Sequence, residues 1–444
     1  MKLFGTDGIR GRAGEAPLDA GTVARIGAAL VRAHEPGAGN MRVLVARDTR
    51  ESGPWIEAEL ARGLTSEGAE VVGAGVLPTP AVAYLTPLGG FDAGIVISAS
   101  HNPFEDNGIK VFSRAGEKLA DAVESRVETL VADSSWQVGV ACDSAVDHQD
   151  LSRPYLEHAR QILGAPRPLA GAHLVLDCAN GATAVVAPAF FESLGFRVDT
   201  IGVAPDGRNI NLQCGSTHLD AIRARVAATG AAAGIAFDGD GDRALLVDER
   251  GRVVDGDAVL LMAAEQLKRE GRLPGDAVVA TVMSNIGLEL ALAERGIELV
   301  RCPVGDKYVK EEMQRRRIAL GGEQSGHIIF ADHLMTGDGI GTALQVLRIM
   351  GATGRSLGEL AAAMVVYPQV LLNVRVRERT DYMSVPAIAD AVRRIEGLVD
   401  GHGRVLIRYS GTEPLLRIMI EGRRDDEIRG WAEEIASAVR AHLA

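Results

Sequence analysis

The chain has 444 residues and a formal net charge of −12 without a basic tract, which argues against binding to nucleic acid or to an anionic membrane. An apolar content of 47% and a charged content of 24% are typical of a globular enzyme. The length predicts three or four domains. The scattered cysteines favour a reducing cytoplasm and argue against zinc fingers. Neither a signal peptide nor a membrane-spanning apolar run is expected.

The first region, residues 1 to about 150, alternates predicted strands with predicted helices. Such alternation indicates βαβ units and a largely parallel sheet. Polar stretches at 133–136 and 147–154 predict irregular structure and a domain boundary near residue 150. The expected elements are strands over residues 42–46, 71–76, 94–97 and 109–112 and helices over residues 55–66 and 79–88.

Two modules with the same rhythm are expected over residues 151–250 and 251–367, each with a polar or glycine-rich loop after a strand. The last module, 368–444, differs and predicts a small α+β domain with an antiparallel sheet. Expected strands in these modules cover residues 173–177, 197–203, 233–237, 277–282, 297–302, 371–376, 404–409 and 416–420. Expected helices cover residues 185–194, 219–229, 257–269, 287–295, 306–316, 339–350, 387–395 and 426–442.

A candidate catalytic loop, Ser98-Ala-Ser-His-Asn-Pro103, follows the buried strand 94–97. It presents hydroxyls, an imidazole and an amide at the carboxyl end of a strand, where open α/β sheets bind ligands. Asn102 precedes a proline and is therefore kept out of the helical region, so the chain turns there. The same residues suit an ordinary polar turn, and the loop alone leaves both interpretations open. Lys110 returns ten residues after Ser100 in the next strand.

A candidate metal site, formed by Asp238, Asp240 and Asp242, follows the strand 233–237. Three carboxylates this close repel one another without a cation, and the intervening glycines let their oxygens converge. Oxygen ligands predict Mg²⁺ or Ca²⁺. An EF-hand is disfavoured because Arg243 stands where glycine is needed and both flanks predict strands. A haloacid-dehalogenase-type nucleophile fits poorly because Asp242 replaces the expected threonine or valine, and a solvated acidic turn fits poorly between apolar flanks.

Two more loops are candidates for substrate binding. The loop 321–327 offers Glu323, Ser325 and His327, but a polar loop with a structural histidine explains it equally well. The segment 408–417 combines two guanidinium groups, two hydroxyls and a glycine, which favours a phosphate site over a hairpin with paired surface charges. Its proposed phosphate ligands are Arg408, Ser410, Gly411, Thr412 and Arg417.

These loops together carry a family resemblance. Over essentially its full length the chain resembles the α-D-phosphohexomutase superfamily, and within it the bacterial members that isomerise glucosamine phosphates. The motifs stand in the family's order and spacing: Phe4-Gly-Thr-Asp-Gly-Ile-Arg-Gly11, Ser98-Ala-Ser-His-Asn-Pro103, Asp238-Gly-Asp-Gly-Asp-Arg243, Gly322-Glu-Gln-Ser-Gly-His327 and Arg408-Tyr-Ser-Gly-Thr-Glu-Pro414. The subgroup rests on residues 209–218, 304–309 and 323–327.

The resemblance implies a heart-shaped enzyme with three similar α/β domains of mixed or parallel sheets and a C-terminal α+β domain. One loop from each domain would line a central cleft. Ser100 would be the phosphoserine, a choice that the residues alone leave open against Ser98. One Mg²⁺ per subunit would be held by phosphorylated Ser100, Asp238, Asp240 and Asp242. Glu323 and Ser325 would bind sugar hydroxyls, and the segment 408–417 would hold the phosphate that is not transferred.

The implied reaction interconverts glucosamine 6-phosphate and glucosamine 1-phosphate through a sugar 1,6-bisphosphate, which also serves as activator. The implied setting is cytoplasmic supply of UDP-N-acetylglucosamine for the cell wall, by a monomer or homodimer. Phosphoserine and three aspartates exceed the charge of one Mg²⁺, so Arg10, Lys110 and Arg243 are expected to balance it. Lys110, His101 and His327 are the candidate bases for the sugar hydroxyl, because a guanidinium such as that of Arg10 does not readily deprotonate.

Three alternatives stay open at this point. A phosphoglucomutase or phosphomannomutase of the same architecture would differ only in the sugar it accepts. A metal-dependent phosphatase that uses Ser100 would release inorganic phosphate. A non-catalytic Ca²⁺-binding or scaffold protein would show neither turnover nor a phosphorylated serine. A serine hydrolase is disfavoured because the chain has no Gly-x-Ser-x-Gly sequence.

Overall fold

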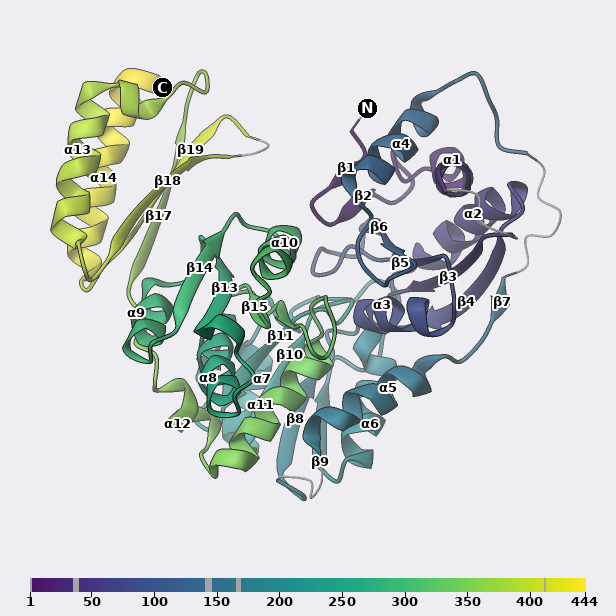
Figure 1. Ribbon diagram of the computed structural model, residues 1–444, viewed down its shortest axis with the longest axis horizontal. Helices are drawn as coiled ribbons and strands as arrows, with labels where there is room; N and C mark the ends of the chain where they lie inside the picture. Colours follow the sequence, from purple (N-terminus) through teal and green to yellow (C-terminus); the bar gives the residue numbers. More distant parts are fainter. Residues whose placement is uncertain (1, 35–39, 140–145, 165–168, 411–412) are drawn as a thin grey trace. The chain divides into compact units, whose positions relative to one another are not determined.

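The computed structural model describes residues 2–34, 40–139, 146–164, 169–410 and 413–444 (Figure 1). The chain forms two compact units. The first comprises residues 1–283 and 297–362, and the second comprises residues 284–296 and 363–444. The predicted domain ranges 1–150, 151–250, 251–367 and 368–444 stay predictions. Across the described ranges, no helix is both long and apolar enough to cross a bilayer.

The first sheet of unit 1 has seven strands in the order β1-β2-β6-β5-β3-β4-β7. Strands β5, β3, β4 and β7 pair in parallel, whereas β6, β2 and β1 pair antiparallel, so the sheet is mixed. Its elements are β1 (Phe4–Gly5), β2 (Gly8–Arg12), α1 (Ala20–Ala33), β3 (Arg42–Arg47), α2 (Gly53–Ser66), β4 (Glu70–Val76), α3 (Thr79–Leu88), β5 (Ala93–Ile97), β6 (Asp106–Ser113), α4 (Asp121–Ala132) and β7 (Asp147–His148).

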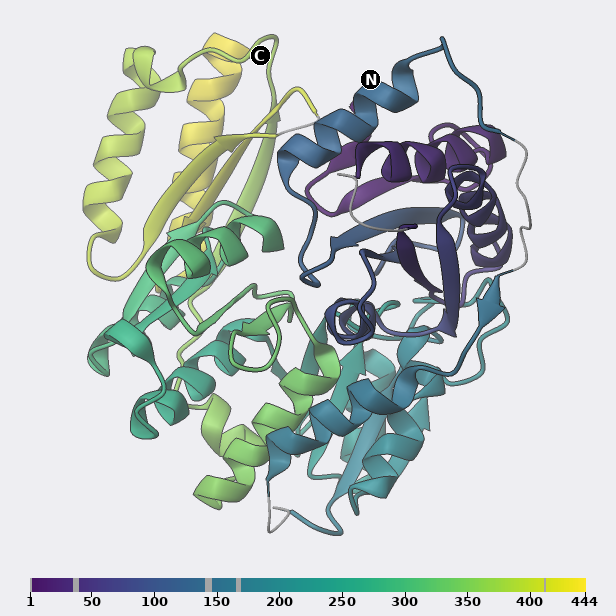
Figure 2. The same cartoon turned by 45° about the vertical axis from the view of Figure 1, so that its right-hand side comes forward.

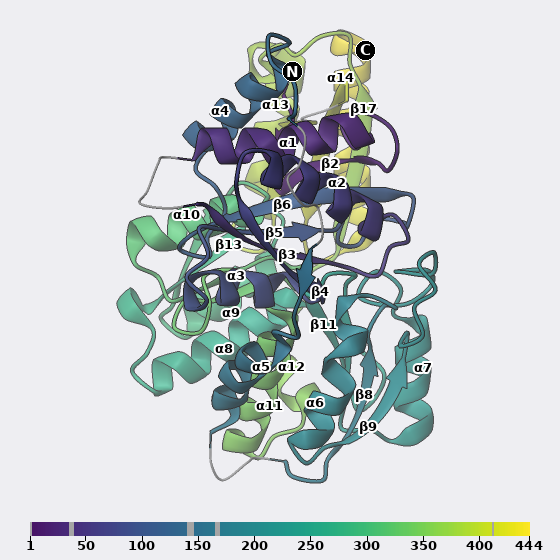
Figure 3. The ribbon, with the colours of Figure 1, turned by 90° about the vertical axis from the view of Figure 1, so that its right-hand side faces the viewer.

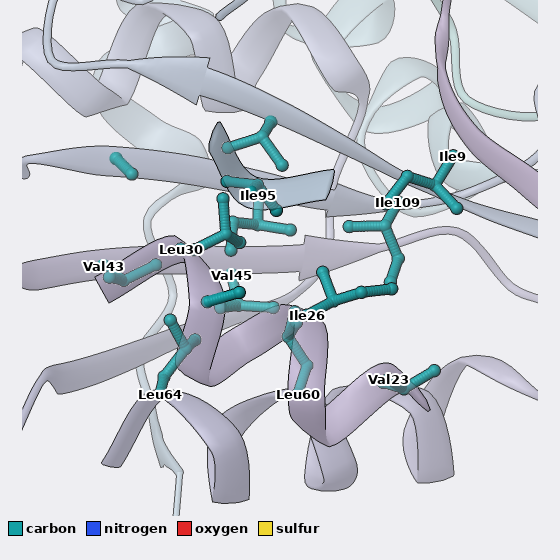
Figure 4. Packing of buried hydrophobic residues seen from close by; sticks show 14 of the residues in the cluster. Ile9, Val23, Ile26, Leu30, Val43, Val45, Leu60, Leu64, Ile95 and Ile109 are labelled. Carbon is teal, nitrogen blue, oxygen red and sulfur yellow. The ribbon is translucent and has the colours of Figure 1, made fainter. Parts of the chain in front are cut away.

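The core of this sheet follows from the alternation of its strands. Figure 3 shows the sheet between α1 and α2 on one side and α3 on the other. Alternate strand residues such as Val43 and Val45 point toward α1 and α2, where they pack with Ile26 and Leu60 (Figure 4). The two helices approach so closely that a Cβ on Gly63 would lie 1.8 Å from the carbonyl oxygen of Ala24.

The second sheet has five strands in the order β12-β11-β10-β8-β9. β10 pairs in parallel with β8 and antiparallel with β11, so the chain turns back directly after Phe237. The elements of this region are α5 (Ser152–Arg160), η1 (Gln161–Leu163), β8 (His173–Asp177), η2 (Ala182–Val185), α6 (Ala187–Ser193), β9 (Arg197–Ile201), α7 (Asp220–Thr229), β10 (Ala233–Phe237), β11 (Ala244–Asp248) and β12 (Val253–Val254).

The third sheet has four strands in the order β14-β13-β15-β16. Its elements are α8 (Gly256–Arg269), η3 (Pro274–Asp276), β13 (Ala277–Thr281), β14 (Glu298–Cys302), α10 (Asp306–Arg316), β15 (Leu320–Gly322), β16 (Ile328–Phe330), α11 (Gly339–Thr353) and α12 (Leu357–Ala361).

One topology recurs in the three sheets. The strand orders β6-β5-β3-β4, β11-β10-β8-β9 and β16-β15-β13-β14 share the same parallel and antiparallel pairings. In each repeat the strand that comes third along the chain, namely β5, β10 or β15, is joined by a hairpin connection to its antiparallel neighbour. The three sequence-predicted loops of this unit are these hairpin connections. The expected similarity of three mixed-sheet α/β domains is confirmed.

Unit 2 contains a three-stranded antiparallel sheet in the order β17-β19-β18, as the sequence predicts. Helices α13 and α14 lie side by side against it (Figures 1 and 2), and residues such as Ile388 and Ile435 meet Ile418 in their shared core. The elements of this unit are α9 (Ile286–Glu294), β17 (Gln369–Arg375), η4 (Tyr382–Ser384), α13 (Pro386–Val399), β18 (Arg404–Tyr409), β19 (Leu415–Glu421) and α14 (Asp425–Leu443).

One expectation about local structure is wrong. The stretch 147–154 is not irregular throughout, because β7 covers its start and α5 begins at Ser152. The helix expected over residues 185–194 is present as the slightly shorter α6, which follows a 3₁₀ turn. Pro188 lies in the first turn of α6, where its missing N–H leaves no bond unmade.

Candidate active site

Ser100 lies in the hairpin connection after β5, at the carboxyl end of a buried strand. Its backbone is left-handed, with a φ of 53°, and its side chain is buried. The hydroxyl donates a hydrogen bond of 2.5 Å to Asp238 Oδ2 and lies 3.2 Å from His101 Nδ1. The structure therefore brings the predicted serine loop and the predicted acidic loop together.

The acidic loop joins β10 to β11. Asp238, Asp240 and Asp242 are buried, and one oxygen from each lies within 4.8 Å of the others. Among the described residues, the Oδ1 atoms of Asp240 and Asp242 have no hydrogen-bond partner. Burial and the charges of the other two aspartates raise the pKa of Asp238 well above its usual value. Buried carboxylate oxygens without donors fit a hard divalent cation, so this triad is able to hold a metal.

The flanks of the acidic loop decide against an EF-hand. β10 and β11 form an antiparallel hairpin with Phe237 opposite Ala244, whereas an EF-hand requires helices on both sides of its loop. The expectation that both flanks are strands is confirmed.

Lys110 reaches the acidic triad from β6. Its ammonium lies 2.8 Å from Asp240 Oδ2, 3.0 Å from Asp242 Oδ2 and 3.1 Å from Asp7 Oδ2. Burial disfavours the charged form, but these carboxylates outweigh burial and raise the pKa of Lys110 well above its usual value. Lys110 is therefore a fixed positive charge in this arrangement. Thr79 also donates a hydrogen bond of 2.6 Å to Asp240 Oδ2.

The two histidines differ in their surroundings. His101 Nδ1 lies 3.2 Å from an Arg243 guanidinium nitrogen, and burial followed by Arg243 and Arg10 lowers the pKa of His101 to about 4. His101 is thus neutral at physiological pH. His327 Nε2 accepts a 3.0 Å hydrogen bond from the Gly337 N–H, which places its ring proton on Nδ1, 3.7 Å from Asp242 Oδ1.

A cavity of about 400 Å³ opens beside these groups. Glu323 borders it, and its Oε1 accepts a 3.0 Å hydrogen bond from the Gly305 N–H while Ser325 Oγ donates to Oε2 at 3.4 Å. The sequence-predicted residues that line the cavity are Arg10, Asp242, Arg243, Glu323 and His327. Residues from all three sheets of unit 1 therefore share one polar space large enough for a small ligand.

An ion-pair network at this cavity was not predicted. Lys118 lies 2.6 Å from both Asp7 Oδ1 and Asp306 Oδ2, and Arg10 lies 2.5 Å from Asp7 Oδ2. Asp7 stands in the N-terminal motif 4–11, so its place in that motif could have identified it as a site residue. Asp306 stands in the segment 304–309, one of the subgroup motifs, whereas Lys118 stands in no such motif and its pairing joins distant parts of the chain.

In unit 2, Arg408 and Arg417 lie directly opposite each other on β18 and β19. Burial and the nearby Arg417 lower the pKa of Arg408. Ser410 Oγ accepts hydrogen bonds from the Glu413 N–H at 3.3 Å and from Arg417 at 3.4 Å. Two opposed guanidinium groups favour a bound anion. The predicted ligands Gly411 and Thr412 lie outside the described residues.

The sequence matches all four domains of one family. These are Phosphoglucomutase/phosphomannomutase alpha/beta/alpha domains I, II and III, over residues 1–137, 153–251 and 255–367, and its C-terminal domain, over residues 371–438. The chain belongs to the phosphoglucomutase/phosphomannomutase family.

Curated relatives carry a more particular name. A phosphoglucosamine mutase of Solibacter usitatus is 49% identical over 443 residues, which are 99% of both chains. A phosphoglucosamine mutase of Geotalea daltonii is 48% identical and covers 100% of this chain and 98% of its own. One of Moorella thermoacetica is 49% identical over 96% of each chain. The expected kinship with enzymes that isomerise glucosamine phosphates is confirmed.

Solved structures share the fold. A phosphoglucomutase/phosphomannomutase family protein from Burkholderia thailandensis has a TM-score of 0.79 at 28% identity, with 98% of this chain and 97% of that chain covered. An Aspergillus fumigatus N-acetylphosphoglucosamine mutase, solved with GlcNAc-6P and magnesium, has a TM-score of 0.69 at 18% identity, with 100% and 96% covered.

Proposed function

We propose that this protein is a phosphoglucosamine mutase that interconverts glucosamine 6-phosphate and glucosamine 1-phosphate. The names of full-length relatives at 45–49% identity support this substrate. The observation that carries the mechanism is the hydrogen bond between Ser100 Oγ and Asp238. Asp238 belongs to a triad of carboxylates that is able to hold a metal ion. It brings a serine hydroxyl from one hairpin against carboxylates from another, which supports Ser100 as the nucleophile beside a metal site.

Ser100 would carry the phosphoryl group as phosphoserine. The free sugar hydroxyl attacks phosphorus, the bond between phosphorus and Ser100 Oγ breaks, and the hydroxyl proton passes to a base. The resulting sugar 1,6-bisphosphate turns over in the site and returns its other phosphoryl group to Ser100. A sugar 1,6-bisphosphate from solution would also phosphorylate a fresh enzyme and so act as activator.

Asp238, Asp240 and Asp242, together with phosphorylated Ser100, would hold one Mg²⁺, which when bound supplies positive charge beside the transferring group. Oxygen-only ligands favour this ion over softer metals. Arg10, Arg243 and Lys110 would offset the remaining negative charge of phosphoserine and the triad.

His101 is the base that we favour for the sugar hydroxyl. Its Nδ1 lies 3.2 Å from both Ser100 Oγ and an Arg243 guanidinium nitrogen, so Nε2 would take the proton. Lys110, in contrast, is held as an ammonium by three carboxylates. His327, whose Nε2 already accepts a backbone N–H, would instead position Asp242. General bases of this kind must lie within hydrogen-bond reach of the proton that they take.

Glu323 and Ser325 would bind sugar hydroxyls, and Arg408, Ser410, Gly411, Thr412 and Arg417 would bind the phosphate that is not transferred. A fixed phosphate site with a carboxylate that grips adjacent hydroxyls accepts both orientations of the bisphosphate. The enzyme would work in the cytoplasm as a monomer or homodimer and feed UDP-N-acetylglucosamine synthesis.

The test compares turnover of glucosamine, glucose and mannose 1-phosphates by the purified enzyme with Mg²⁺ and a trace of sugar 1,6-bisphosphate. We expect kcat/KM for the glucosamine compound to exceed the others by at least about tenfold, as sites that bind a substrate amine reject analogues without it. Higher kcat/KM for glucose or mannose would assign the protein to those mutases. Release of one inorganic phosphate per sugar consumed would make it a phosphatase.

A further inference from the structure

Arg50 is a fully buried arginine below the Ser100 loop. It lies between β3 and α2, and its guanidinium donates to the loop at four carbonyl oxygens. The bonds to Ser100 O, Asn102 O and Asp106 O measure 2.9, 2.8 and 3.0 Å, and a fourth bond goes to Pro103 O. One planar group therefore fixes the whole turn between the serine and β6.

Asp48 ties this arginine to the serine backbone. Its Oδ2 accepts hydrogen bonds from Arg50 Nε at 2.9 Å and from Ser98 Oγ at 2.5 Å. Ser98 Oγ in turn accepts the Ser100 N–H at 2.9 Å. Ser98, the serine that sequence alone could not separate from Ser100, is thus part of the support. The buried charge of Arg50 is paired, as a buried charge must be.

Asn211 holds the same carbonyl from another direction. It lies in the long connection between β9 and α7, and its Nδ2 donates to Ser100 O at 2.9 Å and to Asn102 O at 3.1 Å. Gly239 packs closely against the same carbonyl, because a Cβ there would lie 2.4 Å from Ser100 O. The Ser100 carbonyl therefore has two charged or polar donors and no room to move toward the acidic loop.

These contacts converge on a residue with an unfavourable backbone. A left-handed conformation is unfavourable for a residue with a side chain and persists only where the surroundings enforce it. The Ser100 carbonyl oxygen accepts hydrogen bonds from Arg50 and Asn211. The Ser100 N–H donates a hydrogen bond to Ser98 Oγ. Rotation of that backbone toward an ordinary β conformation would break these bonds and move Oγ away from Asp238.

We infer that Arg50 and Asn211 are positioning residues that clamp Ser100 in its left-handed conformation and aim its Oγ at the acidic triad. The inference rests on the proposed function of Ser100 as phosphoryl carrier. Neither residue lines the cavity, so the clamp should affect the transfer step and leave sugar phosphate binding unchanged. Misplacement of a reacting group by about 1 Å costs on the order of 100-fold in rate.

The test uses Asn211→Gly, because Asn211 has a φ of 59° and glycine keeps that backbone while removing the amide. Gln213→Gly is the matched control, since Gln213 has a φ of 54° in the same connection and an exposed side chain. Each variant is first phosphorylated with a sugar 1,6-bisphosphate, and phosphate per mole is measured by mass spectrometry. We expect kcat per phosphorylated Asn211→Gly enzyme to fall about 10- to 100-fold with KM changed less than about threefold.

Arg50→Lys tests the guanidinium group itself, because lysine keeps the charge beside Asp48 but cannot donate to four carbonyl oxygens at once. We expect a larger fall in kcat than for Asn211→Gly, and Arg153→Lys, at an exposed arginine, should behave as wild type. Wild-type kcat per phosphorylated enzyme in Asn211→Gly would overturn the clamp, whatever the folding of Arg50→Lys. An equal loss in Gln213→Gly would also overturn it. Absence of mutase turnover in the wild-type enzyme would instead overturn the proposed function.

Discussion

At the residue scale, Ser100 and Asp238 are 138 positions apart, yet their side chains share a 2.5 Å hydrogen bond. The rule that ligands bind at the carboxyl ends of strands predicted each loop separately. It could not predict which atoms meet. The contacts of Lys110 with Asp240 and of Arg50 with the serine loop depend on tertiary packing, so no local pattern announces them. Arg50 follows a predicted strand end, which was the one available signal.

The metal assignment predicts the behaviour of Asp240→Asn. The amide removes one charge from the triad and one anionic ligand, so Mg²⁺ affinity should fall at least about tenfold. Lys110 keeps two of its three carboxylate partners, Asp7 and Asp242. Isothermal titration calorimetry with MgCl₂ measures this. Asp220→Asn, at a fully exposed position, is the control and should bind as wild type. Unchanged Mg²⁺ affinity in Asp240→Asn would refute the site.

The phosphate site proposed for unit 2 predicts a different kinetic signature. Arg417→Met removes one of two opposed guanidinium groups, and the phosphate that this group would hold should be bound equally before and during transfer. KM for the sugar phosphate should therefore rise at least about tenfold with little change in kcat. Steady-state kinetics decide the point, with the exposed Arg423→Met as the control. A fall in kcat at constant KM would place Arg417 in the transfer step instead.

At the element scale, strongly patterned segments were predicted with accurate bounds. The predicted ranges agree with the structure for β8, β10, α3 and α10. In these segments the apolar residues and the flanking turn residues indicate the same type of element and the same bounds. α5 was missed because the polar stretch 147–154, which ends at Pro154, predicted irregular structure. Proline is tolerated in the first turn of a helix, where its N–H would have no partner. The sequence showed a shared rhythm of strands and loops in the three modules, but not their common strand order, because topology is kept without residue identity.

The tight contact between α1 and α2 predicts the effect of Gly63→Ala. A Cβ at this position would overlap the backbone of Ala24, so the helices must separate, at a cost of about 1–3 kcal/mol or more. Thermal denaturation should show a melting temperature lower by several degrees. Gly430→Ala, in a helix where a Cβ meets nothing within 4 Å, should leave it unchanged or slightly higher. Equal melting temperatures for both variants would contradict the packing account.

At the scale of the whole molecule, three repeats of one sheet topology each place a hairpin loop at the active site, and each loop has a different chemistry. Under the proposed function the first would carry the nucleophile and the third a sugar-binding carboxylate, and the second holds the carboxylate triad. An acidic protein with a net charge of −12 can still bind a phosphosugar, because the cationic groups are local and partly buried. Composition alone argued against polyanionic partners but could not locate these groups.

The central claim is that phosphoryl groups pass through Ser100. The direct test prepares enzyme with a radiolabelled phosphate on Ser100 and mixes it with glucosamine 6-phosphate in a quenched-flow experiment. The label should leave the protein at a rate no slower than kcat and appear in sugar phosphates, and Ser100→Ala should lose at least about 1000-fold in kcat, a loss typical of a deleted nucleophile. Retention of the label during turnover, or normal turnover by Ser100→Ala, would contradict the account.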